Sequence, residues 1–230
     1  MAVAPLNKFI TVAVPVAPGI QTVYTTPIGV SAIVLYCSVA NVAGVTTFPK
    51  VNINLEREST TSKTLGNLRL NKIANEIEIP PNDTLLALDG RLVLERTAVY
   101  KDSISISGIQ SGVIDITDVD YDSATGVTTV VTDGSHSFMV GQRVTMSGIG
   151  FTCSNLDGSD YTAGITSTIF PNPQRSFEVL ENNVSGDYTK FVTNVGIVNG
   201  IKHHYTENTG QVAPLQMDFI LSILENNSGS

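Results

Sequence analysis

The last apolar segment of the chain is the feature that most constrains its fold. Leu215 to Leu224 (LQMDFILSIL) reads as a core β-strand, because apolar residues fill most of its positions. Such a strand needs a neighbouring strand and a second layer against its apolar side chains. The strands expected from Lys8 to Ile109, more than a hundred residues upstream, would form a β-sandwich that is one strand short. The residues between them are therefore predicted to form a domain inserted into the first.

The sequence predicts an all-β fold with two domains. Residues 1–110 and 208–230 are expected to form a discontinuous Ig-like or jelly-roll-like β-sandwich, and residues 111–207 a small inserted β domain. The 230 residues are enough for two domains of ordinary size, about 100 to 150 residues each. The boundary is placed at Gly108 to Gly112 (GIQSG), and Thr206 to Gly210 (TENTG) is predicted to be the polar link back.

Alternation of apolar and polar residues recurs along the first domain. Val51, Ile53 and Leu55 share one face of an expected strand. Nearly continuous apolar runs occur at Ala32 to Cys37, Leu85 to Leu88 and Phe219 to Leu224, a pattern typical of strands covered on both faces. No window of helical length places apolar residues at i, i+3, i+4 and i+7 opposite a clean polar face, so no helix is predicted.

The N-terminal segment, Ala2 to Gly19, leaves two alternatives open. Pro5, Pro15 and Pro18 prevent it from being a central strand throughout. It is predicted either to be an edge strand of its own sandwich or to extend as an arm onto a neighbouring subunit. With no basic region before the apolar stretch, it is not predicted to be a signal peptide.

Composition excludes several classes of partner. The net charge is −8 and no basic stripe is present, so no nucleic-acid partner is expected. No apolar run approaches the roughly 18 residues that a membrane-spanning helix requires, and no membrane partner is expected. Cys37 and Cys153 lie in different predicted domains and are both expected to be free thiols, which fits assembly in a reducing host cytoplasm.

An acidic row forms one candidate metal site. Asp118, Asp120 and Asp122 alternate along an expected strand and would project three carboxylates to one side, where they could hold calcium. The spacing begins like an EF-hand loop, but Ser123 stands at position six and Thr129 at position twelve. The alternative is a solvent-facing edge strand protected by its charges.

The three histidines form a second candidate. His203 and His204 are adjacent and would point to opposite faces of a strand, so they would need a bulge to bind one ion together with His136. The alternative is a solvated pair and a histidine that stabilises a turn. No cofactor is expected.

No catalytic constellation is visible, and no catalytic residue is assigned. The chain has no Gly-x-Ser-x-Gly elbow, no phosphate-binding glycine loop and no Cys-x-x-Cys. A glycosidase needs paired carboxylates in a cleft, whereas Glu56, Glu58, Glu76 and Glu78 are expected on exposed strand faces. The protein is therefore predicted not to be an enzyme.

Two stretches carry a resemblance to known families. YTTPIGVSAIVLYCSVAN, IPPNDTLLALDGRLVLE and the closing SILE together resemble a β-sandwich module of virion structural proteins of tailed bacteriophages, particularly those of marine cyanobacteria. Ser31 to Leu35 and Gly90 to Glu95 match its strand patterns.

The middle of the chain resembles a second phage module. YDSATGVTTVVTDGSHSFMVGQRVTMSGIGFTC is similar to a tail and fibre repeat in which a valine-threonine strand leads into a turn. The matching spacing is kept by His136, Phe138, Gly141 and Val144. Ser137 replaces the usual glycine and Gln142 the usual aspartate.

The resemblance implies a component of a tailed phage virion but not its place in the particle. We predict a non-enzymatic structural component of the tail, neck or baseplate, assembled as a ring or symmetric oligomer. Its expected partners are other virion proteins and copies of itself. Two alternatives remain open: a capsid decoration protein, or a module that recognises host-surface glycan. For the latter, aromatic rings suit sugar faces, and the candidate side chains are Tyr121, Tyr161, Phe170 and Tyr188.

Overall fold

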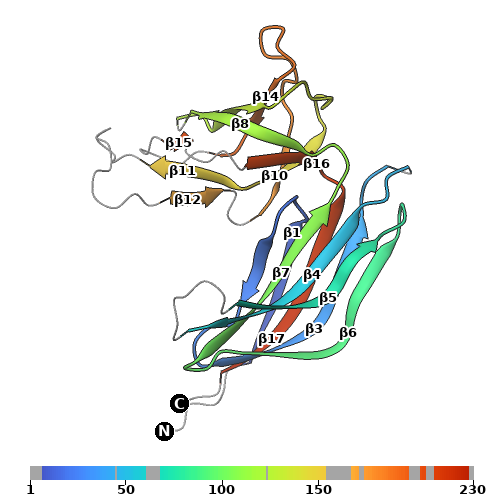
Figure 1. Cartoon of the computed structure of the whole chain (residues 1–230), viewed down its shortest axis with the longest axis vertical. Helices are drawn as coiled ribbons and strands as arrows, with labels where there is room; N and C mark the ends of the chain where they lie inside the picture. The colour runs from blue at the N-terminus through green and yellow to red at the C-terminus, as the bar shows by residue number, and fades with distance from the viewer. Residues whose placement is uncertain are drawn as a thin grey trace. The chain divides into compact units, whose positions relative to one another are not determined.

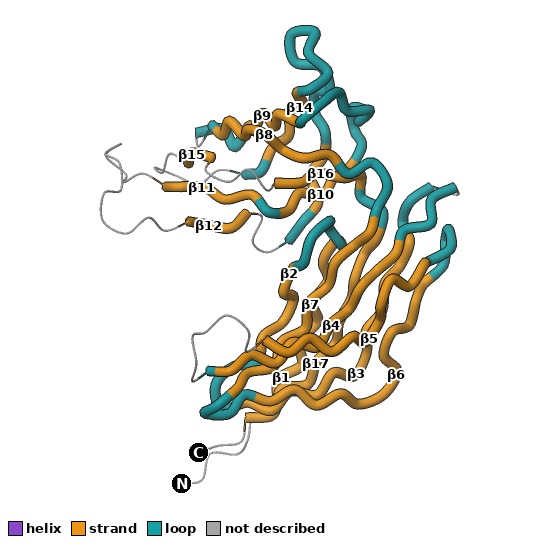
Figure 2. The backbone as a smooth tube through the Cα atoms, viewed as in Figure 1, coloured by secondary structure: helices purple, strands orange, loops and turns teal. Residues whose placement is uncertain are grey.

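The structure is a computed structural model that describes residues 7–44, 46–60, 68–122, 124–153, 167–170, 174–196, 203–205 and 210–227. All of the regular elements within these ranges are β-strands, as Figure 2 shows. The all-β prediction is confirmed. In the same ranges there is no helix with the length and apolar character needed to cross a membrane.

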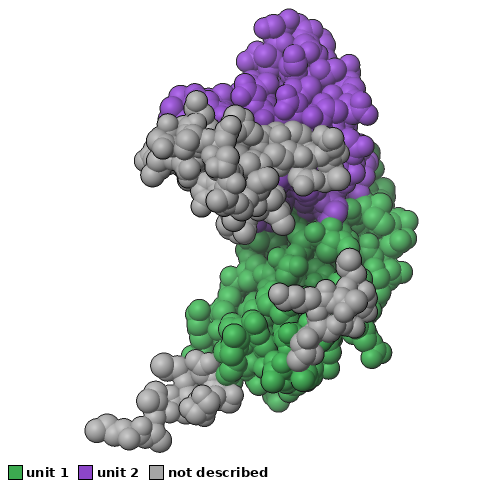
Figure 3. Space-filling model, turned by 60° about the vertical axis from the view of Figure 1, so that its left-hand side comes forward, with its two compact units in different colours: residues 1–16, 20–109, 216–230 green, residues 17–19, 110–215 purple. Residues whose placement is uncertain are grey.

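The chain divides into two compact units, coloured separately in Figure 3. Unit 1 comprises residues 1–16, 20–109 and 216–230, and unit 2 comprises residues 17–19 and 110–215. The return to unit 1 lies later than the sequence predicts. Strand β16 (Gly210–Pro214) pairs with strands of unit 2, so the chain re-enters unit 1 at Gln216 and not at the polar link of 206–210.

Unit 1 consists of two antiparallel sheets (Figure 1). Sheet A has the order β1-β17-β3-β6 and sheet B the order β2-β7-β4-β5. The strands of sheet A are β1 (Asn7–Pro15), β17 (Met217–Asn227), β3 (Val30–Asn41) and β6 (Thr84–Glu95). The strands of sheet B are β2 (Gln21–Thr25), β7 (Tyr100–Ile109), β4 (Lys50–Ser59) and β5 (Leu68–Glu78).

The strand order identifies unit 1 as a jelly roll. Counted along the chain, its eight strands form one sheet in the order 1-8-3-6 and a second in the order 2-7-4-5. This is the arrangement of two interlocked Greek keys. All of unit 2 except residues 17–19 lies between the seventh and eighth strands.

The predicted partner of the last strand is confirmed. In β17, Ile220 pairs with Ala13 of β1 and Leu221 with Cys37 of β3, so β17 runs between the two amino-terminal strands. β1 is an edge strand of sheet A, which confirms the first of the two alternatives for the N-terminal segment. Pro15 ends β1, a position where a missing backbone N–H is tolerated.

The core of unit 1 lies between sheets A and B and is almost entirely aliphatic. It joins Val34 and Leu221 from sheet A to Ile53 and Ile104 from sheet B. Val51 and Ile53 are fully buried and Leu55 packs on the same cluster, as their alternation predicts. Cys37 is a free, buried thiol in this core, and burial raises its pKa to about 12.

Two polar pairs connect the layers of unit 1. The Tyr24 hydroxyl on β2 donates to Glu225 Oε1 on β17 over 2.8 Å. Burial, and next the hydrogen bond to Glu225, raise the pKa of Tyr24. On sheet B, Arg57 donates from Nε and Nη2 to the two carboxylate oxygens of Asp102, each over 2.7 Å. Asp102 is fully buried and also accepts a hydrogen bond from the backbone N–H of Glu95 on sheet A. Its carboxylate therefore has hydrogen-bond donors from both sheets.

Unit 2 is built from shorter strands. Sheet C has the order β13-β10-β16-β8-β9-β14, and sheet D the order β12-β11-β15. The strands of sheet C, besides β16, are β13 (Ser176–Glu178), β10 (Arg143–Ser147), β8 (Ile114–Tyr121), β9 (Val127–Thr132) and β14 (Lys190–Asn194). Those of sheet D are β12 (Ser167–Phe170), β11 (Ile149–Cys153) and β15 (His203–Tyr205). The core of unit 2 is more aromatic, with Phe138, Phe177 and Phe191 buried together.

Candidate functional site

The outer face of sheet A is the first candidate surface. Alternate residues of its strands point away from the core, and many of them are large and apolar. We define this face by Phe9, Thr11 and Ala13 on β1, Ile220, Ser222 and Leu224 on β17, Ile33, Tyr36 and Ser38 on β3, and Leu86 and Val93 on β6. The side chains of Phe9, Val93 and Leu86 are 66%, 50% and 47% exposed.

Strand register collects the apolar residues of this face into a row. Phe9 pairs with Leu224, Leu224 with Ile33, and Ile33 with Val93, so the row crosses all four strands. A second row contains Ala13, Ile220, Ser38 and Leu86. Between the two rows lie Thr11, Ser222 and Tyr36. On β6 the same interval holds Arg91 and also Asp89, which pairs with Tyr36 and whose side chain lies outside the described residues. The face is therefore a continuous and largely apolar surface over β1, β17 and β3, and the charges between its rows lie on the edge strand β6.

The outer face of sheet B is more polar, although Leu68 and Leu70 of β5 are also exposed there. Lys101 and Glu58 form an ion pair with 2.9 Å between Nζ and Oε2. Asn54 Nδ2 donates to Ser105 Oγ over 3.3 Å, and Ser105 Oγ donates to Glu56. Ser103 Oγ on β7 donates to Thr25 Oγ1 on β2 over 3.1 Å. Several polar groups of this face are thus paired with each other across neighbouring strands.

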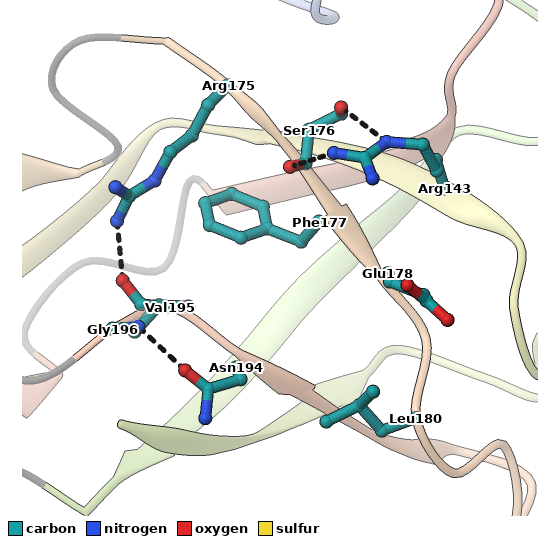
Figure 4. A pocket seen from close by; sticks show the side chains of 9 residues that line it. All are labelled: Arg143, Arg175, Ser176, Phe177, Glu178, Leu180, Asn194, Val195 and Gly196. Atoms are coloured by element: carbon teal, nitrogen blue, oxygen red, sulfur yellow. Dashed lines mark hydrogen bonds between the residues drawn. The ribbon is translucent and has the colours of Figure 1, made fainter. Parts of the chain in front are cut away.

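A hollow in unit 2 is the second candidate site (Figure 4). It is open to solvent, has a volume of about 460 Å³, and lies where β10, β13 and the end of β14 meet. Arg143 donates from Nε and Nη2 to the hydroxyl and carbonyl oxygens of Ser176, both over 2.9 Å. Arg175 Nη2 donates to the carbonyl oxygen of Val195 over 2.6 Å. Both guanidinium groups are therefore held in place by the walls of the hollow.

The chemistry of this hollow suits binding. The guanidinium of Arg175 lies over the ring of Phe177, 5.2 Å from the ring centre. The Phe177 ring is buried and therefore offers no free stacking surface. Leu180 is 47% exposed and supplies the apolar part of the wall. Glu178 is the one carboxylate among the described lining residues, so the hollow lacks the acid pair that glycoside hydrolysis uses.

His136 belongs to the core of unit 2. Its ring stacks on Phe138 with 4.9 Å between centroids and meets the edge of Phe191 at 5.4 Å. The backbone N–H of Phe138 donates to His136 Nδ1 over 3.3 Å, which ties the ring to its own turn. Gly141, at φ +83°, donates its N–H to Val179 O over 2.8 Å. The phage-like motif therefore consists of packing and turn residues.

Gln142 and Val144 complete this motif. The Gln142 side chain accepts the backbone N–H of Met139 over 2.9 Å and closes the turn, where the resembling repeat has aspartate. Val144 is fully buried in the core of unit 2.

The histidine metal site is not assembled in the described part of the chain. His203 and His204 lie in β15, where their backbones pair with Cys153 and Thr152 of β11, but their side chains lie outside the described residues. Across the described side chains, no three His, Cys, Asp or Glu residues come close enough to hold a metal ion.

The acidic row does not lie on an edge strand of sheet C, which was the alternative to a calcium site. β8 lies between β16 and β9 in sheet C, although β16 pairs only with its first residues, Ile114 to Ile116. Asp118 and Asp120 are exposed beyond that pairing. Asp122 follows the strand and closes a turn, since its oxygens accept Ala124 N–H over 2.9 Å and Thr125 Oγ1 over 2.6 Å. These bonds, the one from Thr125 first, lower the pKa of Asp122.

The four aromatic candidates do not form one described cluster. Tyr188 is 54% exposed in the loop between β13 and β14. The hydroxyl of Tyr121 donates to Gly196 O over 2.8 Å, beside the hollow. Tyr161 lies outside the described residues, as does the side chain of Phe170, whose backbone pairs with Ile149.

Sequence reasoning missed both the open face of sheet A and the hollow. The signal for the face was present in the apolar runs of β3 and β17, which predict strands covered on both sides. In the single chain, sheet B covers the inner side, while the outer side stays exposed at Tyr36 and Ile220. The hollow had no signal, because Arg143, Arg175 and Asn194 come from three distant segments.

Comparisons with known proteins give no family. No protein-family model matches the chain, and no curated protein matches it. The chain has a structural likeness to a solved structure titled "Crystal Structure of the STIV MCP", over 97% of each chain, at 9% identity and a TM-score of 0.22. A likeness at this TM-score says nothing further about the chain.

Proposed function

We propose that this protein is a non-enzymatic structural component of a virus particle. The observation that carries the proposal is the outer face of sheet A, where apolar side chains such as Phe9 and Val93 remain exposed across four strands. Soluble monomers rarely expose a continuous apolar surface of this extent, and such surfaces mark sites of protein association. Assembly into a larger object covers it.

Two further observations support a virion as that object. Unit 1 is a jelly roll, a fold used by viral capsid and lectin domains, although this support is an analogy at the level of the fold. The sequence of β3 and β6 resembles virion proteins of tailed phages, as described above. On that basis we assign the protein to the tail, neck or baseplate of a tailed phage, assembled in the host cytoplasm, with capsid decoration as the alternative position.

The partners follow from the same surfaces. We propose contacts with other virion proteins and with copies of this chain, and none with nucleic acid or a membrane, since the chain carries a net charge of −8. We further propose that the protein catalyses no reaction. Release of reducing sugar or peptide from phage-host polysaccharide or peptidoglycan by the purified protein would contradict this.

Localisation in particles tests the proposed function. Virions of the encoding phage are purified by density gradient, and the protein is detected by mass spectrometry and by gold-labelled antibody in electron micrographs. We expect a fixed copy number per particle and label at the tail, neck or baseplate. Label over the whole head would move the protein to the decoration position, and absence from purified particles would contradict a virion role.

The hollow in unit 2 favours a second candidate function, recognition of host-surface glycan. Its fixed guanidinium groups, Arg143 and Arg175, can donate to sugar hydroxyl or carboxylate oxygens, and Tyr188 is exposed elsewhere in the same unit. Glycan-array binding by the full chain that is lost in Arg143→Ala supports recognition. Absence of binding across the array leaves the structural role alone.

A further inference from the structure

We propose that the outer face of sheet A is the interface with a second copy of this chain, packed face to face about a two-fold axis. This inference rests on the proposed function and names the partner of that surface. In an isologous interface the same patch serves both subunits, so the patch must be complementary to itself. Three properties of the face meet this requirement.

The first property is the two-sided apolar pattern of the central strands. β17 buries Leu221 and Ile223 against sheet B and directs Ile220 and Leu224 outward, while β3 buries Val34 and directs Ile33 outward. Strands with apolar residues on both faces are found where both faces of a sheet are covered. Sheet B covers one face of these strands within the chain. In the proposed dimer, the same apolar face of a second copy covers the outer face.

The second property is the confinement of charge to the margins of the face. On the outward-facing strand positions with described side chains, the charged residues are Asp218 near one end of β17 and Arg91 and Glu95 on the edge strand β6. Asp89 of β6 also pairs with Tyr36, but its side chain lies outside the described residues. Two chains that each carry −8 repel each other, and their surfaces can meet most easily where neither presents a charge. The paired charges of sheet B, Glu58 and Lys101, would have to be desolvated in such a contact.

The third property is size. The strands of sheet A have nine to twelve residues. At about 3.4 Å per residue and about 4.8 Å between strands, the face measures about 30 Å by 19 Å. Each copy would therefore bury about 600 Å², or about 1,200 Å² in total, which reaches the range of specific and stable interfaces.

The centre of the face lies between β17 and β3, at Ser222 and Tyr36, which pair with each other. A two-fold axis through this centre brings Ser222 of one copy close to Ser222 of the other, since packed sheets are about 10 Å apart. Phe9 and Val93, at the two ends of the apolar row, become buried in the contact.

Charge substitution with a matched control tests the interface. The full-length protein is measured by sedimentation velocity from about 1 to 100 µM, alongside Val93→Lys and Leu70→Lys. Val93 is 50% exposed on the edge strand of sheet A, and Leu70 is 45% exposed on the edge strand of sheet B, opposite Glu56. We expect a dimer for the unchanged chain and for Leu70→Lys. For Val93→Lys we expect a dimer dissociation constant at least about 100-fold weaker, because the contact would have to desolvate the lysine charge.

Cross-linking checks the position of the axis. In a Cys153→Ser background, Ser222→Cys is treated with a bismaleimide whose arm spans about 10 Å, and Ser107→Cys on sheet B serves as the control. Cys37 is buried with a raised pKa and stays unreactive. A cross-linked dimer with Ser222→Cys and none with Ser107→Cys supports the proposal.

Three results would overturn the interface: a monomeric unchanged chain at 100 µM, a dimer equally tight in Val93→Lys, or equal cross-linking of both cysteine variants. Far-ultraviolet circular dichroism of each variant confirms that loss of the dimer is not loss of the fold. The two proposals fail separately. A chain that is present in virions but monomeric keeps the proposed function without this interface, and a dimer that is absent from virions keeps the interface without the function.

Discussion

Units 1 and 2 of this chain are both built from antiparallel strands, but different interactions stabilise the two units. Unit 1 has mostly long strands, an aliphatic core between sheets A and B, and an ion pair, Arg57–Asp102, whose carboxylate is buried. Unit 2 has strands of eight residues or fewer and packs an aromatic group, His136, Phe138 and Phe191, beneath its loops. Long strands specify their own pairing by alternation, whereas short strands depend on turns that connect distant segments.

Core truncation is the strongest way to break this comparison. Phe191→Ala and Phe219→Ala each remove a fully buried ring, one from unit 2 and one from unit 1. Each is expected to lower the free energy of unfolding of its own unit by about 3 to 5 kcal/mol. Hydrogen exchange followed by mass spectrometry should show faster exchange in the unit that carries the change. Equal acceleration in both units would mean that the two cores unfold as one.

A glycine in a turn of unit 2 gives the next largest effect. Gly126 has φ +77°, and a Cβ there would lie 2.7 Å from the backbone carbon of Gly196. Gly126→Ala should therefore destabilise unit 2 by about 3 kcal/mol, through both backbone strain and overlap. Gly90 in β6 has open space around it, so Gly90→Ala is the control and should be neutral in urea unfolding. Similar midpoints for the two variants would refute the dependence of unit 2 on its turns.

The buried ion pair of unit 1 comes third. Asp102→Ala removes the carboxylate that accepts two bonds from Arg57 and one from the Glu95 N–H. Because Arg57 is 42% exposed and can be rehydrated, the loss should be about 2 kcal/mol, less than for a fully buried pair. Chemical denaturation monitored by Tyr fluorescence measures it. The surface pair Lys101–Glu58 is the control, and Lys101→Ala should change the free energy of unfolding by less than about 1 kcal/mol.

The smallest expected effect is an opposite response of the two units to pH. Tyr24 in unit 1 has a pKa raised above its ordinary 10.0, so its stabilising contribution is complete below pH 10 and is lost as the pH rises further. Asp187 in unit 2 accepts bonds from Thr189 first and Lys190 next, which lower its pKa from 3.8 to about 2. Its contribution is complete above pH 3.8 and is lost as the pH falls toward 2.

Hydrogen exchange at the two pH limits measures this difference. Unit 1 should lose protection first in alkali and unit 2 first in acid, once the intrinsic dependence of exchange on pH is corrected. Tyr24→Phe and Asp187→Asn should each flatten the response of their own unit. An unchanged acid response in Asp187→Asn would show that other carboxylates of unit 2 dominate.

The sequence predicts the fold of unit 1 better than that of unit 2 for physical reasons. Val51, Ile53 and Leu55 alternate over a long strand, and β17 is apolar enough to demand a distant partner. β16, only five residues long, carries too weak a pattern to reveal its place beside β8 and β10.

The candidate surfaces were less predictable. The apolar runs of β3 and β17 indicate that both faces are covered, but a sequence of one chain does not tell which molecule covers the second face. In unit 2, the turn residues His136 and Gly141 carry a local pattern, whereas their contacts with Phe191 and Val179 arise only on folding.

The central place of β17 also sets the order in which the nascent chain can fold. β17 begins at Met217, yet it lies between β1 and β3, which are translated long before it. All of unit 2 is translated before sheet A can close, and domains generally fold as they emerge. A chain that stops before Met217 therefore lacks the strand that pairs with both β1 and β3, and its sheet A stays open.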